Sequence, residues 1–369
     1  MWVDTATVVP NFNFDESTHS LKVDINPNAS PQAVFELLFM ENIMQYVVDC
    51  TNNYGAALTT TNRPKTKNSR DAYFPPVSLD EMKKFFALCL LQGQISTSNM
   101  RRFFSYADIL YVHPLFSYVM SGRRFEQILR VLYCSTTLSK KKEKGQPFLD
   151  MLIDQFQSIY SPPKELSLDE SLLHFRSRLG FRVYNKNKKS KYGIKFYELT
   201  TSEGYLLNTE MYTGAVENKE QDSTNNKLEP LVLRLMKPYL MKGHKLYMDN
   251  FYNSYRLFEK LLALRTHSCG TLRSNRIGNP CELVNKKVKK GDHIWARRNQ
   301  VYVSKWRDKR DVLIITTRDH PRLEPTTNRY AKELIKPIEI VAYNRHMSGI
   351  NRCDQMISTY STPRKPTVV

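Results

Sequence analysis

Between Ser30 and about residue 160, apolar residues recur every third or fourth position, which is the spacing of amphipathic helices. Ser30, followed by a proline, predicts the beginning of a helix that continues to Gly55. Ser78 and Glu81 have the spacing of a capping box at the beginning of another helix. Together with a further amphipathic segment after position 120, these helices predict a helical domain over residues 30–163.

The pattern changes near residue 165, where short runs of alternating, aromatic and β-branched residues begin. The first three runs have connections too short for crossovers, so we expect an antiparallel meander. Helices are predicted at 227–240, at 253–264 with Asn253 as the cap, and at 343–358. This order predicts a mixed α/β (α+β) fold with helices against a mixed sheet. The runs that predict strands read LSLDES, KFYELTT, GYLLNTEMYTG, HKLYMDNFY and THSCGTLRS.

Residues between the fifth predicted strand and the final helix alternate like a small antiparallel unit and are strongly basic. Positions 271–310 hold twelve basic and three acidic residues, in a chain whose net charge is +19. Residues 1–29, by contrast, are polar and acidic and predict a flexible arm. We therefore expect this arm, the helical domain, a core divided into 164–274 and 336–369, and a basic insertion over 275–335.

Composition excludes several classes of protein. No apolar run approaches the roughly 20 residues that a membrane-spanning helix needs, and the N-terminus lacks the pattern of a signal peptide. The six cysteines are scattered and form no CxxC pair, so we expect no zinc site in this chain. We expect buried free thiols in a reducing compartment instead, and no membrane partner.

The distribution of positive charge predicts a polyanionic partner, because clustered Lys and Arg residues are typical of nucleic-acid-binding surfaces. Aromatic residues accompany the basic ones. Trp295, Tyr302 and Trp306 are expected to pack inward, since alternate residues of a strand point into the core. The residues predicted to contact DNA are Arg182, Lys186, Lys188, Lys189, Lys191, Arg273, Arg276, Lys286, Lys287, Lys289, Lys290, Arg297 and Arg298.

Two acidic residues end short β-prone runs, and a third acidic position has lost its charge. Asp169 lies in LSLDES and Asp249 in LYMDNFYNS, whereas the predicted final helix carries Asn351 and Asp354. Carboxylates that converge from separate elements can hold Mg²⁺, and two such ions can promote phosphoryl transfer. Asp169, Asp249 and Asp354 are therefore candidate ligands of a weakened or lost Mg²⁺ or Mn²⁺ site. Glu170 is expected to face outward or to support that site.

Six ordered segments resemble the piggyBac family of DDE transposases and the host proteins derived from them. The resemblance runs from about residue 30 to the end of the chain. It implies an RNase H-like catalytic core, a preceding helical domain for dimerisation and DNA binding, and a basic insertion within the core. It also implies excision of DNA through hairpin ends, with rejoining at TTAA and two Mg²⁺ ions. The segments read SPPKELSLDESLLHFRSR, KYGIKFYELTTSEGYLLNTEMYTG, LYMDNFYNSYRLFEKL, GTLRSNR, KWRDKRDVLIITT and YNRHMSGINRCDQMISTYS.

The resemblance also implies catalytic roles, with one departure. Asp169 matches the first catalytic Asp and Asp249 the second. The third belongs to a GVDxxDQ-like block that here reads GINRCDQ, so Asn351 stands in its place and Asp354 matches the second Asp of the block. Asn offers a neutral oxygen without the charge that holds a hard cation. Asp354 shares a helix face with position 351, but a misplacement of about 1 Å can cost roughly 100-fold in rate.

Our first interpretation is a nuclear, domesticated DNA-binding protein with a degenerate triad and no transposition activity. One alternative is an active Mg²⁺-dependent transposase or nuclease, in which Asp354 serves or Asn351 is an engineered change. Another is a host regulatory protein whose core is now a protein-interaction scaffold. The expected partners are DNA, a second copy in a homodimer, and host regulatory proteins. The chain stops at Val369 without the zinc module of family transposases, which predicts a truncated C-terminal region and weak sequence selectivity.

Overall fold

The computed structural model divides into two compact units, which we describe separately. The core unit consists of Met1–Val23 and Gln157–Asp354, and the helical unit of Asp24–Phe156 and Gln355–Val369. The structure describes residues 1–60, 73–95, 99–106, 113–136, 145–175, 179–186, 191–214, 228–327 and 333–359.

Aromatic and aliphatic residues at helical spacing form the interior of the helical unit. Phe85, Phe116, Phe125 and Ile128 are at most 1% exposed there and belong to one apolar cluster. The elements of this part of the chain are α1 (Pro31–Leu38), α2 (Glu41–Thr59), α3 (Leu79–Gln94), η2 (Met100–Phe104), α4 (Pro114–Val119), α5 (Gly122–Val131) and α6 (Gln146–Ile159), the last of which ends in the core unit.

The helix beginnings predicted at Ser30 and Ser78 are confirmed, since each hydroxyl accepts a hydrogen bond from the backbone N–H three residues later. The helix after Ser30 is not continuous, because the two residues between α1 and α2 adopt non-helical dihedral angles. The predicted capping box is also only half correct. The Glu81 carboxylate pairs with Arg124 at 2.6 Å, so this ion pair ties α3 to α5.

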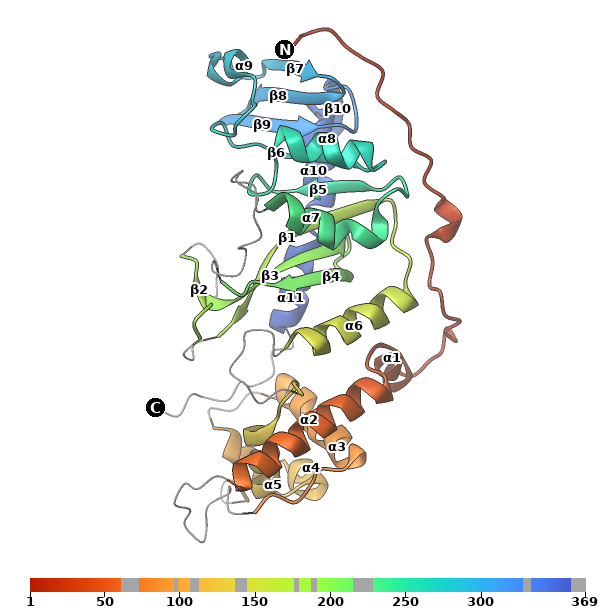
Figure 1. The fold of residues 1–369 in the computed structure, drawn as a ribbon, viewed down its shortest axis with the longest axis vertical. Helices are drawn as coiled ribbons and strands as arrows, with labels where there is room; N and C mark the ends of the chain where they lie inside the picture. The colour runs from red at the N-terminus through yellow and green to blue at the C-terminus, as the bar shows by residue number, and fades with distance from the viewer. Residues whose placement is uncertain are drawn as a thin grey trace. The chain divides into compact units, whose positions relative to one another are not determined.

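A nine-stranded mixed sheet organises the core unit, in the order β2-β3-β1-β5-β6-β9-β8-β7, with β4 also paired to β3 (Figure 1). The predicted meander is confirmed, because β1, β3 and β4 pair antiparallel. Strands β5 and β6 run parallel to β1. The strands are β1 (Glu165–His174), β2 (Val183–Tyr184), β3 (Tyr192–Thr201), β4 (Leu206–Met211), β5 (Lys245–Met248), β6 (His267–Thr271), β7 (His293–Arg298), β8 (Val301–Arg307) and β9 (Asp311–Thr316), with β10 (Leu323–Thr327) and β11 (Glu333–Pro337) forming a separate pair.

The two faces of the sheet carry different residues because strand side chains alternate. Leu168, Leu246 and Met248 face an apolar cluster with α7 and α8, whereas Tyr247 and Cys269 face α10. The predicted final helix is divided into α10 and α11. The described helices of the core unit are η1 (Glu16–Thr18), α7 (Leu228–Met236), η4 (Lys237–Tyr239), α8 (Tyr255–Ala263), α9 (Cys281–Asn285), α10 (Ile338–His346) and α11 (Gly349–Thr359), of which the residues from Gln355 onward are assigned to the helical unit. The mixed α/β fold with an RNase H-like core is as predicted.

The basic strands β7–β9 pair antiparallel, as the alternation predicted, but they do not form a sheet of their own. Strand β9 pairs with β6, so all three strands continue the main sheet. Tyr302 and Trp306 are buried as expected, at 0% and 8% exposure, and Trp295 packs edge-on against Tyr302.

Residues 1–23, most of the segment predicted as a flexible acidic arm, run in extended conformation along the core unit (Figure 1). Val3 and Arg297 form a two-way backbone bridge on β7. The Tyr302 hydroxyl donates to the Thr7 carbonyl at 3.1 Å. These contacts give the segment a defined path.

No described helix is long and apolar enough to cross a membrane. All six cysteines are free, but only Cys50 and Cys269 are buried as expected. Cys89, Cys134 and Cys353 are partly exposed, and Cys281 is exposed at the beginning of α9. Its position in the first turn of a short surface helix explains the exposure.

Candidate metal and nucleic-acid site

Sheet register brings Asp169 and Asp249 side by side. Strands β1 and β5 pair in parallel up to Leu168 opposite Met248, and each aspartate is the next residue. Neighbouring strands lie about 4.8 Å apart, so the two carboxylates share an edge of the same face. The Glu170 N–H donates to Asp169 Oδ1 at 2.8 Å. The first two positions predicted for the site therefore do converge.

The neighbours of this pair come from β6 and α10. Thr271 Oγ1 donates to Asp249 Oδ1 at 3.1 Å. Burial raises the pKa of Tyr343, on α10, well above its usual range, and the nearby charges of Asp249 and Asp169 raise it further. The Tyr343 phenol on α10 therefore lies in the neighbourhood of both carboxylates.

Asn253 holds the end of β5 in place rather than capping α8 as predicted. It is fully buried, and its Nδ2 donates to the carbonyls of Met248 at 3.0 Å and Thr271 at 2.7 Å. Ser254 caps α8 instead, since its hydroxyl accepts the Leu257 N–H. The Asn253 amide thus joins the ends of β5 and β6 directly before Asp249.

Sequence reasoning missed Glu198. It is paired opposite Asp169 in the antiparallel β1–β3 register, so the two side chains lie on one face. Glu198 is only 8% exposed, and its charge raises the pKa of Cys353 on α11, after the larger effect of burial. The sequence did contain a signal for Glu198, because it is the one acidic residue inside the β-prone run KFYELTT.

Helix α11 presents positions 351 and 354 differently. Ile350 is fully buried, and Asp354, four residues later on the same helix face, is partly buried. Asn351 is exposed. Residues 351 and 354 therefore differ in exposure, although their spacing of three places them near one another on α11, and a metal-binding role for either one stays a prediction.

The described residues fit a divalent cation only in part. Asp169 and Asp249 supply two neighbouring carboxylates, which suit a hard cation. Within the part of the chain that the structure describes, no three His, Cys, Asp or Glu residues converge closely enough to hold a metal ion. Glu170 points to the opposite face of β1, where its carboxylate lies 3.2 Å from Lys195 Nζ. Asp169 and Asp249 are thus the two neighbouring carboxylates at the strand ends, and within the described residues Glu198 does not complete a group of three.

The predicted DNA-contacting residues divide into exposed and engaged groups. Lys188 and Lys189 lie outside the described residues. Arg182 is exposed over the Tyr192 ring at 5.0 Å, and Arg298 over the Tyr255 ring at 4.7 Å. The other exposed members are Lys186, Lys191, Arg273, Lys286, Lys287, Lys289 and Lys290.

Arg276 and Arg297 are partly buried and already have partners. The Arg276 guanidinium donates to the carbonyls of Asn250 and Phe251, and its pKa is lowered by burial and then by Arg273. Arg297 donates to the carbonyl and hydroxyl of Thr5. Both arginines therefore hold loops in place, which the sequence could not indicate.

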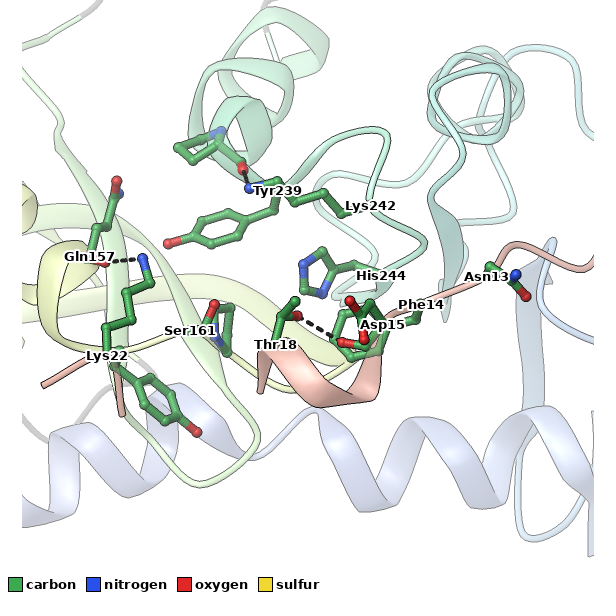
Figure 2. A pocket seen from close by; sticks show the side chains of 13 residues that line it. Asn13, Phe14, Asp15, Thr18, Lys22, Gln157, Ser161, Tyr239, Lys242 and His244 are labelled. Atoms are coloured by element: carbon green, nitrogen blue, oxygen red, sulfur yellow. Dashed lines mark hydrogen bonds between the residues drawn. The ribbon is translucent and has the colours of Figure 1, made fainter. Parts of the chain in front are cut away.

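A cavity of about 430 Å³ lies elsewhere in the core unit, between the N-terminal segment and the η4 region (Figure 2). Its wall includes His244, Lys22 and Lys242, but Lys22 Nζ donates to the Gln157 carbonyl and Lys242 Nζ to the Pro238 carbonyl. These amines support the wall, so the cavity carries no functional assignment.

Comparison with known proteins identifies a transposase family model and transposase-derived relatives. A family model described as Transposase IS4 matches residues 30–368. Human piggyBac transposable element-derived protein 3 is 24% identical over 352 residues, covering 90% of this chain and 56% of that protein. Human piggyBac transposable element-derived protein 5 is 24% identical over 360 residues, covering 92% and 67%. The chain thus spans about half to two thirds of these relatives.

The same relationship is found among solved structures. A piggyBac transposase in a synaptic complex with hairpin DNA, studied by cryo-EM, superposes with a TM-score of 0.76 at 25% identity. The match covers 92% of this chain and 70% of that chain.

Proposed function

Because the chain belongs to the piggyBac family of DDE transposases, we propose that it is a nuclear DNA-binding protein, derived from a transposase, without transposition activity. The observation that carries the proposal is the exposed amide of Asn351 at the position where the family has its third acid. A site with two carboxylates, Asp169 and Asp249, neutralises less of the charge of two divalent ions than a site with three.

Metal binding at this site is proposed to be weak. Asp169 and Asp249 would hold Mg²⁺ or Mn²⁺, and the ion would stabilise negative charge on a phosphate oxygen. The Thr271 and Asn253 contacts keep the two strand ends together, so the pair needs little rearrangement. Without a third charge, we expect occupancy only at high metal concentration.

DNA is the proposed partner of the basic surface. Lys286, Lys287, Lys289 and Lys290 follow the short helix α9 and are all exposed. Lysines in such a cluster neutralise phosphates and release counterions, which favours binding at low salt. The related transposase of known structure was solved with hairpin DNA, which supports the same class of partner. A homodimer and host regulatory proteins remain further proposed partners.

A salt titration tests the DNA proposal. Fluorescence anisotropy with a labelled duplex should show affinity falling steeply with salt, with a log–log slope of about −0.9 for each phosphate neutralised. Replacing the four lysines by alanine should make that slope shallower by up to about 3.6. Replacing them by arginine is the matched control and should leave the slope unchanged. A wild-type affinity that does not depend on salt would refute the proposal.

A second candidate function is Mg²⁺-dependent cleavage of a DNA strand. The partly buried position of Asp354, four residues after the fully buried Ile350 on α11, favours it. A supercoiled-plasmid nicking assay with Mg²⁺ and Mn²⁺ distinguishes the two functions. Nicking that disappears in both Asp169→Asn and Asp354→Asn would establish the second candidate. If the wild type leaves the plasmid intact while binding it, the first proposal holds.

A further inference from the structure

An isoleucine stands almost fully in solvent in the loop between β6 and α9. Ile277 is 93% exposed. The next residue, Gly278, has a φ of +87°, a left-handed conformation that side-chain-bearing residues rarely adopt. The chain therefore turns sharply just after Ile277, which leaves the side chain at the tip of the loop. A single exposed aliphatic residue is common on protein surfaces, so its surroundings must decide its role.

The loop that carries Ile277 is braced from within and from the N-terminal segment. Asn279 Nδ2 donates to the carbonyls of Arg273 at 2.9 Å and Ser274 at 3.2 Å. The Trp2 indole donates to the Gly278 carbonyl at 3.0 Å. A loop tied at these points holds its tip in a fixed position, so Ile277 does not need to be ordered when a ligand arrives.

The same loop is fastened to the segment that carries Asp249. Arg273 Nε donates to Asn250 Oδ1 at 2.9 Å, and Arg276 Nη2 donates to the Asn250 carbonyl at 3.1 Å. Asn250 directly follows Asp249. Ile277 is thus an apolar tip flanked by two arginines, on a loop attached beside the candidate carboxylates.

We propose that Ile277 is a wedge that inserts between two adjacent base pairs of bound duplex DNA and unstacks that step. Aliphatic side chains that enter a base step partly unstack it and kink the duplex. Arg273 and the lysines after α9 would hold the phosphates on either side. This inference rests on the proposed function, in which DNA is the partner. It goes beyond that function by proposing that the bound duplex is distorted next to Asp169 and Asp249. Local positive charge favours DNA over an apolar protein surface as the partner.

Fluorescence of 2-aminopurine tests the wedge, using the full chain at low salt. The probe is a set of duplexes in which 2-aminopurine replaces the adenine of a single TpA step, since pyrimidine–purine steps unstack most easily. We expect the fluorescence to rise on binding, and Ile277→Ala to reduce this rise at least roughly fivefold because the inserted side chain is gone. Affinity should change less than about threefold, since phosphate contacts dominate it.

Two further variants make the test specific. Ile277→Leu retains a branched aliphatic tip and should retain the fluorescence rise. Ile335→Ala removes an isoleucine that is 66% exposed on β11 and should behave as the wild type. Salt-dependent binding without any 2-aminopurine response, or an undiminished response in Ile277→Ala, would overturn the wedge while leaving DNA binding intact. Loss of wild-type binding at low salt would overturn the proposed function as well.

Discussion

Glu339 is the residue whose removal we expect to destabilise the core unit most clearly. It lies in the first turn of α10 and is 1% exposed. Its Oε1 accepts the Ser304 hydroxyl at 2.6 Å and lies 2.8 Å from His293 Nε2. These two partners come from β8 and β7, so one carboxylate anchors α10 to the basic end of the sheet.

The expected magnitude follows from these contacts. Glu339→Ala leaves Ser304 and His293 without the oxygen that they contact. Each buried polar group left without its partner costs about 1–3 kcal/mol, so we expect a loss of about 2–6 kcal/mol in the free energy of unfolding. Glu339→Gln keeps an oxygen for Ser304 but removes the charge, so we expect a loss of about 1–2 kcal/mol. Glu333→Ala, at an exposed position of β11, is the matched control and should change stability by less than about 0.5 kcal/mol.

Urea unfolding followed by tryptophan fluorescence measures this loss in the relevant unit. The chain has three tryptophans, and all of them, Trp2, Trp295 and Trp306, belong to the core unit. Trp306 packs in the same apolar cluster as Ile340, the residue after Glu339. A Glu339→Ala variant that unfolds within about 1 kcal/mol of the wild type would refute the idea that this carboxylate anchors α10.

Three further predictions concern metal, pH and assembly. Asn351→Asp should tighten Mn²⁺ binding measured by calorimetry, and an unchanged affinity would count against a ligand role for position 351. Burial lowers the pKa of His244 to about 4, so the unfolded state binds the proton first as the pH falls below about 6.5. The free energy of unfolding should therefore drop by roughly 2–3 kcal/mol between pH 7 and pH 4.5, and His244→Gln should remove part of that drop; an equally steep drop in the variant would contradict the assignment. Light scattering should show a dimer mass at high micromolar concentration, whereas a constant monomer mass would rule out the proposed homodimer.

Local patterns were sufficient to predict most of the elements. Alternation of apolar and polar residues identified the strands, and Ser30 and Ser78 identified helix beginnings, because both signals act within a few residues. The break between α10 and α11 was not predictable in this way. A Cβ at Gly349 would lie 2.4 Å from Thr200 Oγ1, so the beginning of α11 depends on contact with a strand almost 150 positions earlier.

The candidate site was predictable only where sheet register determines it. Asp169 and Asp249 each end a β-prone run, and parallel pairing of those runs is sufficient to bring them together. Glu198 becomes relevant only because the antiparallel register sets it opposite Asp169. The pairing of β9 with β6 likewise joins residues about 45 positions apart and could not be inferred from alternation alone.

Helix orientation, rather than the number of acidic residues, determines what the third position can do. The spacing of Asn351 and Asp354 allows both to lie on one helix face, but Asp354 is partly buried whereas Asn351 is exposed. Strands β1 and β5 fix two carboxylates through hydrogen-bonded register, whereas α11 is held by the close approach of Gly349 to β3 and by the ion pair between Arg352 and Glu203. The loss of charge at Asn351 therefore affects a position of the site that lies on a helix rather than at the end of a strand.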